Sequence, residues 1–138
     1  MTCVIDASVT LAWLLQDEHT AASDALFEHV AEFGAVVPSL WRLEVANALQ
    51  VAVRRGRVDE VSRDTSLRLL ERFMIEVDGE TDARAWTDTL RLADRHGLTV
   101  YDAAYLELSL RRGLPLATRD DKLSDAARMA GTKVVPTQ

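Results

Sequence analysis

Four acidic residues each follow a short apolar segment or lie near the start of the helical segment that comes next: Asp6, Glu44, Asp102 and Asp120. In an open parallel sheet, ligands bind beyond the carboxyl ends of the strands, so these four side chains can face one cleft. Clustered carboxylates repel one another, and a divalent cation removes that conflict. Because all the ligand atoms are oxygens, Mg²⁺ or Mn²⁺ is the expected ion, and its bound waters can attack a phosphodiester.

Helix capping is an alternative explanation for three of these acids taken singly. Asp102 and Asp120 begin expected helices, where an aspartate caps amide groups or complements the helix dipole. Asp6 could cap the first helix as well, although Ser8 competes for that position. Glu44 stands among mostly apolar neighbours on a half-buried helix, where an acid needs a partner. The residues alone leave a shared metal site and separate caps both open.

Short apolar segments alternate with longer helical segments along the chain. Five segments rich in Val, Ile or Leu lack polar alternation, which is typical of buried parallel strands: residues 3–5, 35–37, 74–77, 114–117 and 133–135. The expected helices cover residues 8–15, 20–33, 39–55, 59–73, 82–96, 101–112 and 121–130. This order predicts one α/β domain over residues 1–138, with three α/β/α layers around a mostly parallel, five-stranded sheet.

Composition limits the class of protein. The chain has 138 residues, with 16 basic and 22 acidic side chains and a net charge of −6. A chain of this length can bury enough surface to fold without disulfides, and the single cysteine, Cys3, cannot form an intramolecular one. With no signal-like N-terminus and no apolar stretch of membrane-spanning length, we expect a soluble, cytoplasmic protein. The acidic balance argues against coating of duplex nucleic acid through overall charge.

Four blocks of the sequence carry a resemblance to a known family: Asp6-Ala7-Ser8, Glu44-Val45-Ala46-Asn47, Tyr101-Asp102-Ala103-Ala104-Tyr105 and Leu116-Ala117-Thr118-Arg119-Asp120-Asp121-Lys122-Leu123. They resemble the acidic blocks of PIN-domain ribonucleases, especially the small VapC-type toxins of toxin–antitoxin pairs, over nearly the whole chain. The resemblance implies a PIN-like α/β/α fold with a five-stranded parallel sheet and Mg²⁺- or Mn²⁺-dependent cleavage of RNA. It also implies a homodimer and a cognate antitoxin that occupies the active-site groove.

The resemblance further assigns expected roles to individual residues. In such enzymes the metal is held, directly or through water, by the acids that match Asp6, Glu44, Asp102 and Asp120. Ser8 and Thr118 match hydroxyl residues that support the first and fourth acids. Asp121 could supply the fourth carboxylate in place of Asp120, although Thr118-Arg119-Asp120 fits the family spacing better. Helical spacing adds a further candidate: Asn47 lies three residues after Glu44 on one helical face, so it could hydrogen-bond that carboxylate or a metal-bound water.

An RNA substrate must still approach an acidic chain. Only Lys122 and Lys133 are lysine, which leaves 14 arginines, the side chain best suited to bidentate phosphate contacts. Arg119 and Lys122 flank Asp120 and are the expected RNA contacts. Two other groups, Arg54-Arg55-Gly56-Arg57 and Arg111-Arg112, are explained equally well as solvated helix ends.

Apolar residues lie on two sides of the expected helix 39–55, more than one buried stripe requires. The second side could pack on helix 59–73, on another copy of the chain or on an antitoxin segment. The aromatic residues Trp13, Trp41 and Trp86 are expected in the core or an interface rather than as base-stacking platforms.

Other functions fit the sequence less well or differ in biological role. A response-regulator receiver domain needs an acidic pair after the first strand, whereas here Asp6 is followed by Ala7. No phosphate-cradling glycine-rich motif is present in the sequence. A housekeeping PIN nuclease and a PIN-fold interaction module with a degenerate site stay open as alternatives, although the presence of all four acids argues against the second.

Overall fold

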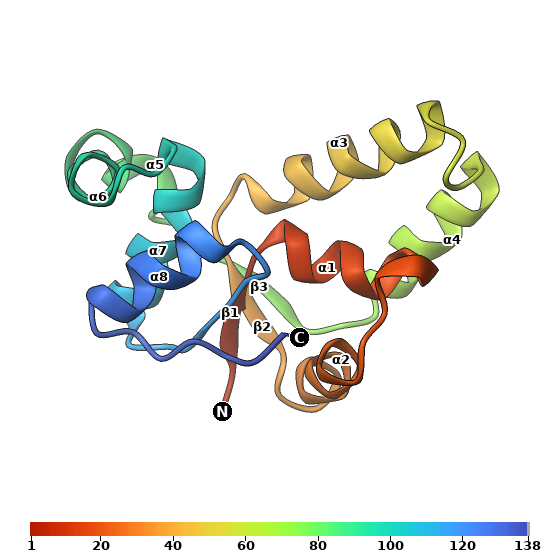
Figure 1. Cartoon of the computed structure of the whole chain (residues 1–138), viewed down its shortest axis with the longest axis horizontal. Coiled ribbons are helices and arrows are strands. Elements are labelled where there is room, and N and C mark those ends of the chain that lie inside the picture. The colour runs from red at the N-terminus through yellow and green to blue at the C-terminus, as the bar shows by residue number, and fades with distance from the viewer. Residues whose placement is uncertain (138) are drawn as a thin grey trace.

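The computed structural model describes residues 1–137, and a parallel sheet lies at its centre (Figure 1). The strands are β1 (Cys3–Ile5), β2 (Ala35–Val37), β3 (Ile75–Val77) and β4 (Leu116–Ala117). They pair in the order β3-β2-β1-β4, and every pairing is parallel. From β1 the chain adds β2 and β3 on one side, and it then adds β4 on the other side of β1. The space between β1 and β4 is therefore the topological switch point, where an α/β sheet offers a ligand site.

The helices largely follow the expected segments. They are α1 (Ala7–Leu14), the 3₁₀ turn η1 (Gln16–Glu18), α2 (Ala21–Phe33), α3 (Trp41–Arg54), α4 (Glu60–Leu70), α5 (Thr81–Arg84), the π-helical η2 (Ala85–Thr89), α6 (Leu90–His96), α7 (Val100–Arg112) and α8 (Asp121–Met129). The expected helix 82–96 therefore contains a π-helical turn, which residue periodicity did not indicate. Within residues 1–137, no helix combines the length and the apolar character needed to cross a membrane.

The expected fifth strand, residues 133–135, forms only a parallel bridge between Leu116 and Val134. Two backbone hydrogen bonds of 2.9 Å hold it, from Leu116 N–H to Lys133 O and from Val135 N–H to Leu116 O. The sheet of the described chain thus has four strands rather than the expected five. Pro115 and Pro136 flank the bridge, and neither can donate a backbone hydrogen bond that would extend it.

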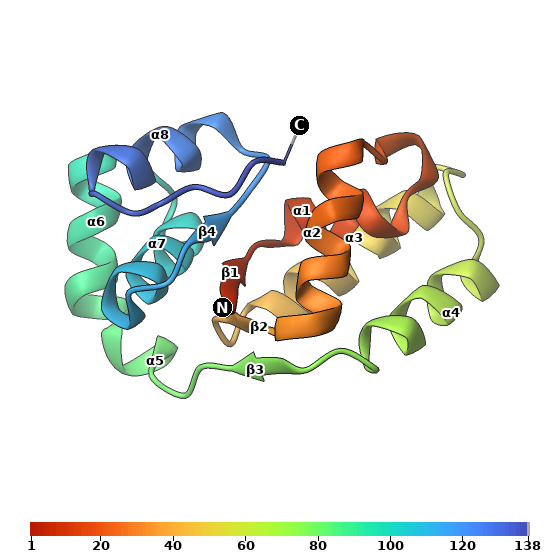
Figure 2. The same cartoon turned by 90° about the horizontal axis from the view of Figure 1, so that it is seen from below.

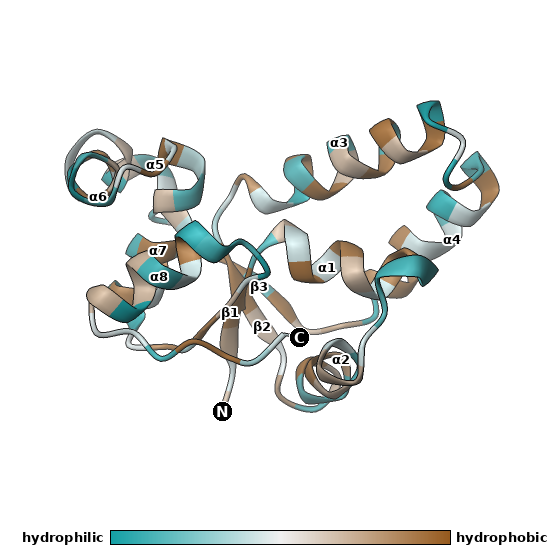
Figure 3. Ribbon diagram, viewed as in Figure 1, coloured by the Kyte–Doolittle hydropathy of each residue, from teal (hydrophilic) through white to brown (hydrophobic). Residues whose placement is uncertain are grey.

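Helices cover the sheet in layers, as the fold class requires. Figures 1 and 2 show α1, α2 and α3 on one side of the strands and α7 and α8 on the other, with α5 and α6 beside α7. The strands at the centre are apolar (Figure 3), and Val4 and Ile5 are fully buried. β3 is the edge strand, and it exposes Glu76 and Val77.

One side of α3 is buried and the other is not. Trp41, Val45, Leu49 and Ala52 pack in the core, whereas Leu43 is 75% exposed. The second apolar side of this helix is therefore covered only in part within the described chain, because Leu43 and Ala46 are exposed while Leu49 is buried and Val53 is half-buried. Among the aromatic residues, Trp13 and Trp41 are buried in the core, whereas Trp86 is 91% exposed, and its place in an interface stays a prediction.

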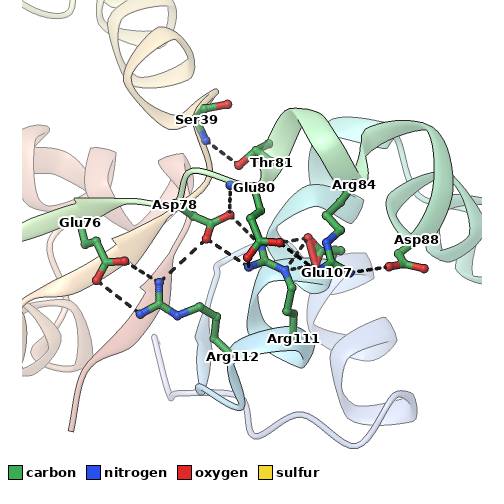
Figure 4. A network of polar contacts seen from close by, with 10 residues as sticks. All are labelled: Ser39, Glu76, Asp78, Glu80, Thr81, Arg84, Asp88, Glu107, Arg111 and Arg112. Carbon is green, nitrogen blue, oxygen red and sulfur yellow. Dashed lines mark hydrogen bonds and ion pairs between the residues drawn. The ribbon is translucent and has the colours of Figure 1, made fainter.

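A network of ion pairs joins the end of β3 to α7 (Figure 4). Arg111 of α7 donates to Asp78 at 2.7 Å and to Glu107 at 2.8 Å, and both carboxylates are buried. It also reaches Glu80 at 3.2 Å. Because the Arg111 guanidinium donates hydrogen bonds to Asp78, it holds the pKa of that carboxyl below its usual range. The network fixes the chain after β3 against the helix that carries Asp102.

Candidate active site

Sheet register brings the first acid beside the fourth strand. Ile5 pairs with Ala117, so the next residues of the two strands, Asp6 and Thr118, are neighbours at the switch point. The Thr118 hydroxyl donates to Asp6 Oδ2, and Ser8 Oγ donates to Asp6 Oδ1 at 2.6 Å. Asp6 is buried, and its Oδ1 also accepts from Val9 N–H at 3.1 Å, which makes it the N-cap of α1. Of the two residues that could cap the first helix, Asp6 is the cap, and Ser8 orients the Asp6 carboxylate instead.

Thr118 connects the first acid to the fourth. Its Oγ1 accepts the backbone N–H of Asp120 at 3.0 Å while it donates to Asp6. Asp120 is exposed and caps α8 through a 2.8 Å hydrogen bond from Leu123 N–H to its Oδ1. One carboxylate oxygen of Asp120 is thus engaged in the cap. Asp120 therefore caps α8 and is also linked to Asp6 through Thr118.

Glu44 has a partner that sequence reasoning missed. The Tyr105 hydroxyl on α7 donates to Glu44 Oε1 on α3 at 2.5 Å, and the tyrosine is buried. Desolvation raises the pKa of both groups, and for Tyr105 the adjacent carboxylate raises it further. Tyr105 stands three residues after Asp102 and so shares its helical face, which is the spacing signal that could have indicated it.

Asp102 is half-buried in the first turn of α7 and does not cap it. Thr99 is the N-cap, and its Oγ1 accepts from the backbone N–H of Asp102 at 3.1 Å. Burial raises the pKa of Asp102, as does the charge of Asp120, while Thr99 and the Lys122 ammonium oppose the shift. The carboxylate of this residue is therefore left free of the capping role that was the alternative explanation for it.

The acids influence one another's ionisation. After desolvation, the charge of Asp102 raises the pKa of both Asp6 and Glu44, and the charge of Asp6 also raises that of Glu44. Within the described residues, no three His, Cys, Asp or Glu side chains already form a group that could hold a metal ion. Mg²⁺ keeps several waters and usually takes only one or two carboxylates from the protein, so it does not require such a group.

Comparison with known proteins identifies the family. The family model described as PIN domain matches residues 3–129. The chain belongs to the PIN domain family. Over 125 residues the PIN chain is 32% identical to a Pyrobaculum aerophilum protein named Ribonuclease VapC3, covering 91% of this chain and 94% of that protein. Over 81 residues it is 37% identical to Exonuclease VapC9 of the same organism, covering 58% and 57% of the two chains.

A solved structure shares the PIN fold. The crystal structure of PAE2754 from Pyrobaculum aerophilum matches with a TM-score of 0.71 and 29% identity, covering 98% of this chain and 91% of that one. The expected PIN-like α/β fold is confirmed, apart from the number of strands. The resemblance to VapC-type PIN ribonucleases is confirmed as well, by relatives that carry that name.

Other expected site residues of the PIN domain lie differently. Asn47 is exposed, and no hydrogen bond in residues 1–137 joins it to Glu44, whose oxygen accepts from Tyr105 instead. Asp121 is exposed and begins α8. Lys122 is exposed too, and its charge lowers the pKa of Asp102, which places it near the acids.

Arg119, the expected arginine contact to RNA, is engaged in an ion pair in the PIN domain, and so are three of the other candidate arginines, Arg57, Arg111 and Arg112. Arg119 Nη1 donates to Glu18 at 3.0 Å, and its backbone N–H donates to Ser8 Oγ at 2.9 Å. Arg57 binds the same glutamate at 2.9 Å. Arg111 and Arg112 take part in the network at the end of β3, so that pair is explained by the fold.

Proposed function

We propose that this PIN domain is a Mg²⁺- or Mn²⁺-dependent endoribonuclease that acts as the toxin of a toxin–antitoxin pair. The observation that carries the proposal is the set of acids at the switch point whose pKa values are raised by burial and by one another. Such a site is poised for a cation, because bound positive charge relieves both the repulsion and the burial penalty. The names of the relatives, Ribonuclease VapC3 and Exonuclease VapC9, favour nuclease chemistry.

The donor set fits a hard divalent ion. We expect Asp6, Glu44, Asp102 and Asp120 to hold it, directly or through water. When bound, the ion supplies positive charge to the scissile phosphate and lowers the pKa of a water that can attack it, leaving 5′-phosphate and 3′-hydroxyl ends. Around it, Ser8 and Thr118 fix the orientation of the Asp6 carboxylate through their hydroxyl groups.

Glu44 and the substrate contacts complete the proposed site. Tyr105 holds Glu44 against α7 and donates to it, which favours the ionised carboxylate that a metal needs. Lys122 lies near Asp102 and offers a charge to an RNA phosphate, and Arg119 follows Thr118 directly in the chain. We propose a structured RNA with an accessible single-stranded segment as the substrate.

Two protein partners belong to the proposal. The exposed apolar residues of α3, Leu43 and Ala46, are available for a second copy in a homodimer or for a segment of the antitoxin. We expect that segment to occupy the active-site groove and to present an Arg or Lys toward the acids, where the cation would inhibit by replacing the metal. A cytoplasmic location fits an RNA substrate and the free thiol of Cys3, whose pKa burial raises to about 11.

Cleavage of a labelled RNA with a single-stranded loop tests the proposal. We expect cleavage with Mg²⁺ or Mn²⁺, none with EDTA, and loss of activity in Asp6→Asn and Asp102→Asn. The control is Asp94→Asn, which removes an exposed acid of α6 and should cleave normally. Undiminished cleavage by both site variants in EDTA would show that the chemistry lies elsewhere.

The toxin role is tested separately from the activity. Induced expression of the wild-type chain should arrest growth of the host, and Asp6→Asn should not. An active nuclease that leaves growth unaffected would instead fit a housekeeping role in RNA processing. A folded chain that binds partners but never cleaves would fit the interaction module.

A further inference from the structure

Two arginines from distant parts of the chain meet on one glutamate beside the acids. Glu18, in the 3₁₀ turn after α1, accepts from Arg119 Nη1 at 3.0 Å through Oε1 and from Arg57 Nη2 at 2.9 Å through Oε2. Arg57 follows α3, and Arg119 follows β4, so 62 residues separate them. Each oxygen of the carboxylate therefore faces a different guanidinium.

The backbone of Arg119 connects the two arginines, Arg57 and Arg119, to the proposed site. That residue lies between Thr118 and Asp120, and its N–H is bound to Ser8, the residue that orients Asp6. Its side chain reaches Glu18, which also binds Arg57. An RNA strand cut at the acids and lying along this side chain would reach the second guanidinium next.

The chemistry of the pair suits a phosphate. Guanidinium groups bind carboxylate and phosphate oxygens in the same bidentate manner, so a carboxylate held by two of them occupies a position that a phosphate can take. The side chains of Arg119, Glu18 and Arg57 are 23%, 28% and 40% exposed, so solvent and solutes can reach the contact. Ion pairs with this exposure are weak enough to exchange partners.

A groove of about 1110 Å³ lies beside Arg57 and leaves room for a phosphate at that guanidinium. Its lining also includes the acids Asp17, Asp59 and Glu60, so the arginines supply the positive charge that a phosphate needs there. Asp17 also binds Arg57, at 3.0 Å, so the two arginines are neutralised by two acids of one short turn. The free protein thus presents little net charge at a place where two cations converge.

Building on the proposed function, we propose that Arg57 and Arg119 bind the phosphate backbone of the RNA substrate and that Glu18 occupies their phosphate position in the free protein. Glu18 is then an internal competitor that RNA must displace. Its effect is to weaken binding of any polyanion that does not also engage the acids. Removing its charge while keeping its shape should therefore strengthen RNA binding.

The test is RNA binding by Glu18→Gln. Fluorescence anisotropy of a labelled single-stranded RNA, measured in EDTA so that no cleavage occurs, should show about twofold to tenfold tighter binding than wild type. The dependence of affinity on salt should become steeper by about 0.7 for each additional phosphate that the variant neutralises. Glu28→Gln, which removes the same charge from an exposed position on α2, is the matched control and should change neither quantity.

A combined variant separates this role from a structural one. When Glu18→Gln is added to the double variant Arg57→Gln/Arg119→Gln, the affinity for RNA should not increase. The two guanidinium groups that Glu18→Gln would release are already missing. If Glu18 serves only to tie the turn to α3 and β4, Glu18→Gln lowers the melting temperature and leaves RNA affinity unchanged. That outcome overturns the inference.

Inorganic polyphosphate distinguishes failure of the inference from failure of the proposed function. Tighter polyphosphate binding by Glu18→Gln, together with no metal-dependent RNA cleavage by the wild type, contradicts the nuclease and supports the phosphate position. Metal-dependent RNA cleavage, with equal RNA and polyphosphate affinities in wild type and Glu18→Gln, supports the nuclease and overturns the phosphate position.

Discussion

Tyr105 donates its hydroxyl to Glu44 at 2.5 Å and so joins α7, which carries Asp102, to α3. The tyrosine is buried, and its ring and hydroxyl hold the glutamate at the end of the sheet where Asp6 lies. Burial and the charges of Asp102 and Asp6 raise the pKa of Glu44, whereas the hydrogen bond from Tyr105 lowers it. The ionisation of one proposed ligand therefore depends on a residue that binds no metal.

Tyr105→Phe should weaken metal binding and move it to higher pH. Removal of the hydroxyl leaves Glu44 without its donor, so the pKa of Glu44 rises further and protons compete better with the metal. Loss of the hydrogen bond at a partly buried carboxylate should also cost about 1–3 kcal/mol of stability. Calorimetric titration with Mn²⁺ over a pH series measures the shift.

Tyr101→Phe is the matched control for that experiment. Tyr101 precedes Asp102 on α7, but its side chain is 66% exposed, so the loss of its hydroxyl should leave the pH dependence of Mn²⁺ binding unchanged. Equal pH shifts in the two variants would mean that Tyr105 does not act through Glu44.

Asp102→Asn should stabilise the metal-free protein and reduce its response to metal. Asp102 is half-buried, and its charge raises the pKa of Asp6 and Glu44, so its neutralisation relieves repulsion. Relief of about 1 kcal/mol would raise the melting temperature in EDTA by roughly 3–5 °C. Mn²⁺ at a hundredfold excess over Kd should stabilise the wild type by about 2.7 kcal/mol and the variant by much less.

Thermal melts in EDTA and in Mn²⁺ provide the measurement, with Asp94→Asn as the exposed-acid control. A control variant that is stabilised as much as Asp102→Asn would point to a general effect of net charge. Equal Mn²⁺ responses in wild type and Asp102→Asn would contradict a shared metal site.

The metal-free and metal-bound proteins should respond to pH in opposite ways. The folded-state pKa values of Asp6, Glu44 and Asp102 lie above the unfolded values, so the folded state binds more protons between the two. The contribution of these groups to stability therefore decreases as pH rises from about 4 through the raised values. The stabilisation by Mn²⁺ should increase over the same range, because deprotonated carboxylates bind the ion. Urea titrations at several pH values, with and without Mn²⁺, test both slopes.

Thr118→Val should impair cleavage more than folding, and Thr118→Ser should restore it. Valine keeps the shape of the buried side chain but removes the hydroxyl that donates to Asp6 and accepts from Asp120 N–H. The Asp6 carboxylate then loses one orienting contact, and mutations of such supporting residues typically cost about tenfold to a hundredfold in metal affinity or activity. The measurement is the cleavage rate and the Mn²⁺ affinity of the two variants. If Thr118→Ser cleaves as slowly as Thr118→Val, the role of Thr118 is packing rather than orientation of Asp6.

Arg111→Met should destabilise the fold strongly. It leaves Glu107 without its cation and leaves Asp78 with only Arg112, at 3.9 Å. The two carboxylates are 4% and 5% exposed, and the loss of one partner from a buried ion pair costs about 3–5 kcal/mol. The pKa of Asp78 is held low by this arginine, so in the wild type its contribution is present above pH 4 and is lost as pH falls.

Arg112→Met provides the comparison for the ion-pair network. The side chain of Arg112 is 32% exposed and that of its nearest partner, Glu76, is 58% exposed, while its distance to the buried Asp78 is 3.9 Å. Its loss should therefore cost less, about 1 kcal/mol. Chemical denaturation of both variants at neutral pH measures the two free energies of unfolding. Similar losses in the two would contradict the burial argument.

The sequence by itself determined four of the five expected strands, most of the helical segments and the positions of the four acids along the chain. Apolar runs without alternation mark strands buried on both faces, and helical periodicity marks the segments between them, because both patterns depend on neighbours within a few residues. The position of Asp6 directly after β1 followed from the chain alone. So did the placement of Asp102 in the first turn of a helix, although its capping residue, Thr99, did not.

Only the tertiary structure decided which side chains meet. Tyr105 and Glu44 are 61 residues apart, and Arg119 and Glu18 are 101 apart, so no local pattern links them. The register of β1 against β4 sets Asp6 beside Thr118, and two prolines confine the fifth expected strand to a single bridge. Burial of Trp13 and exposure of Trp86 likewise depend on what packs over each residue, which residue type alone does not fix.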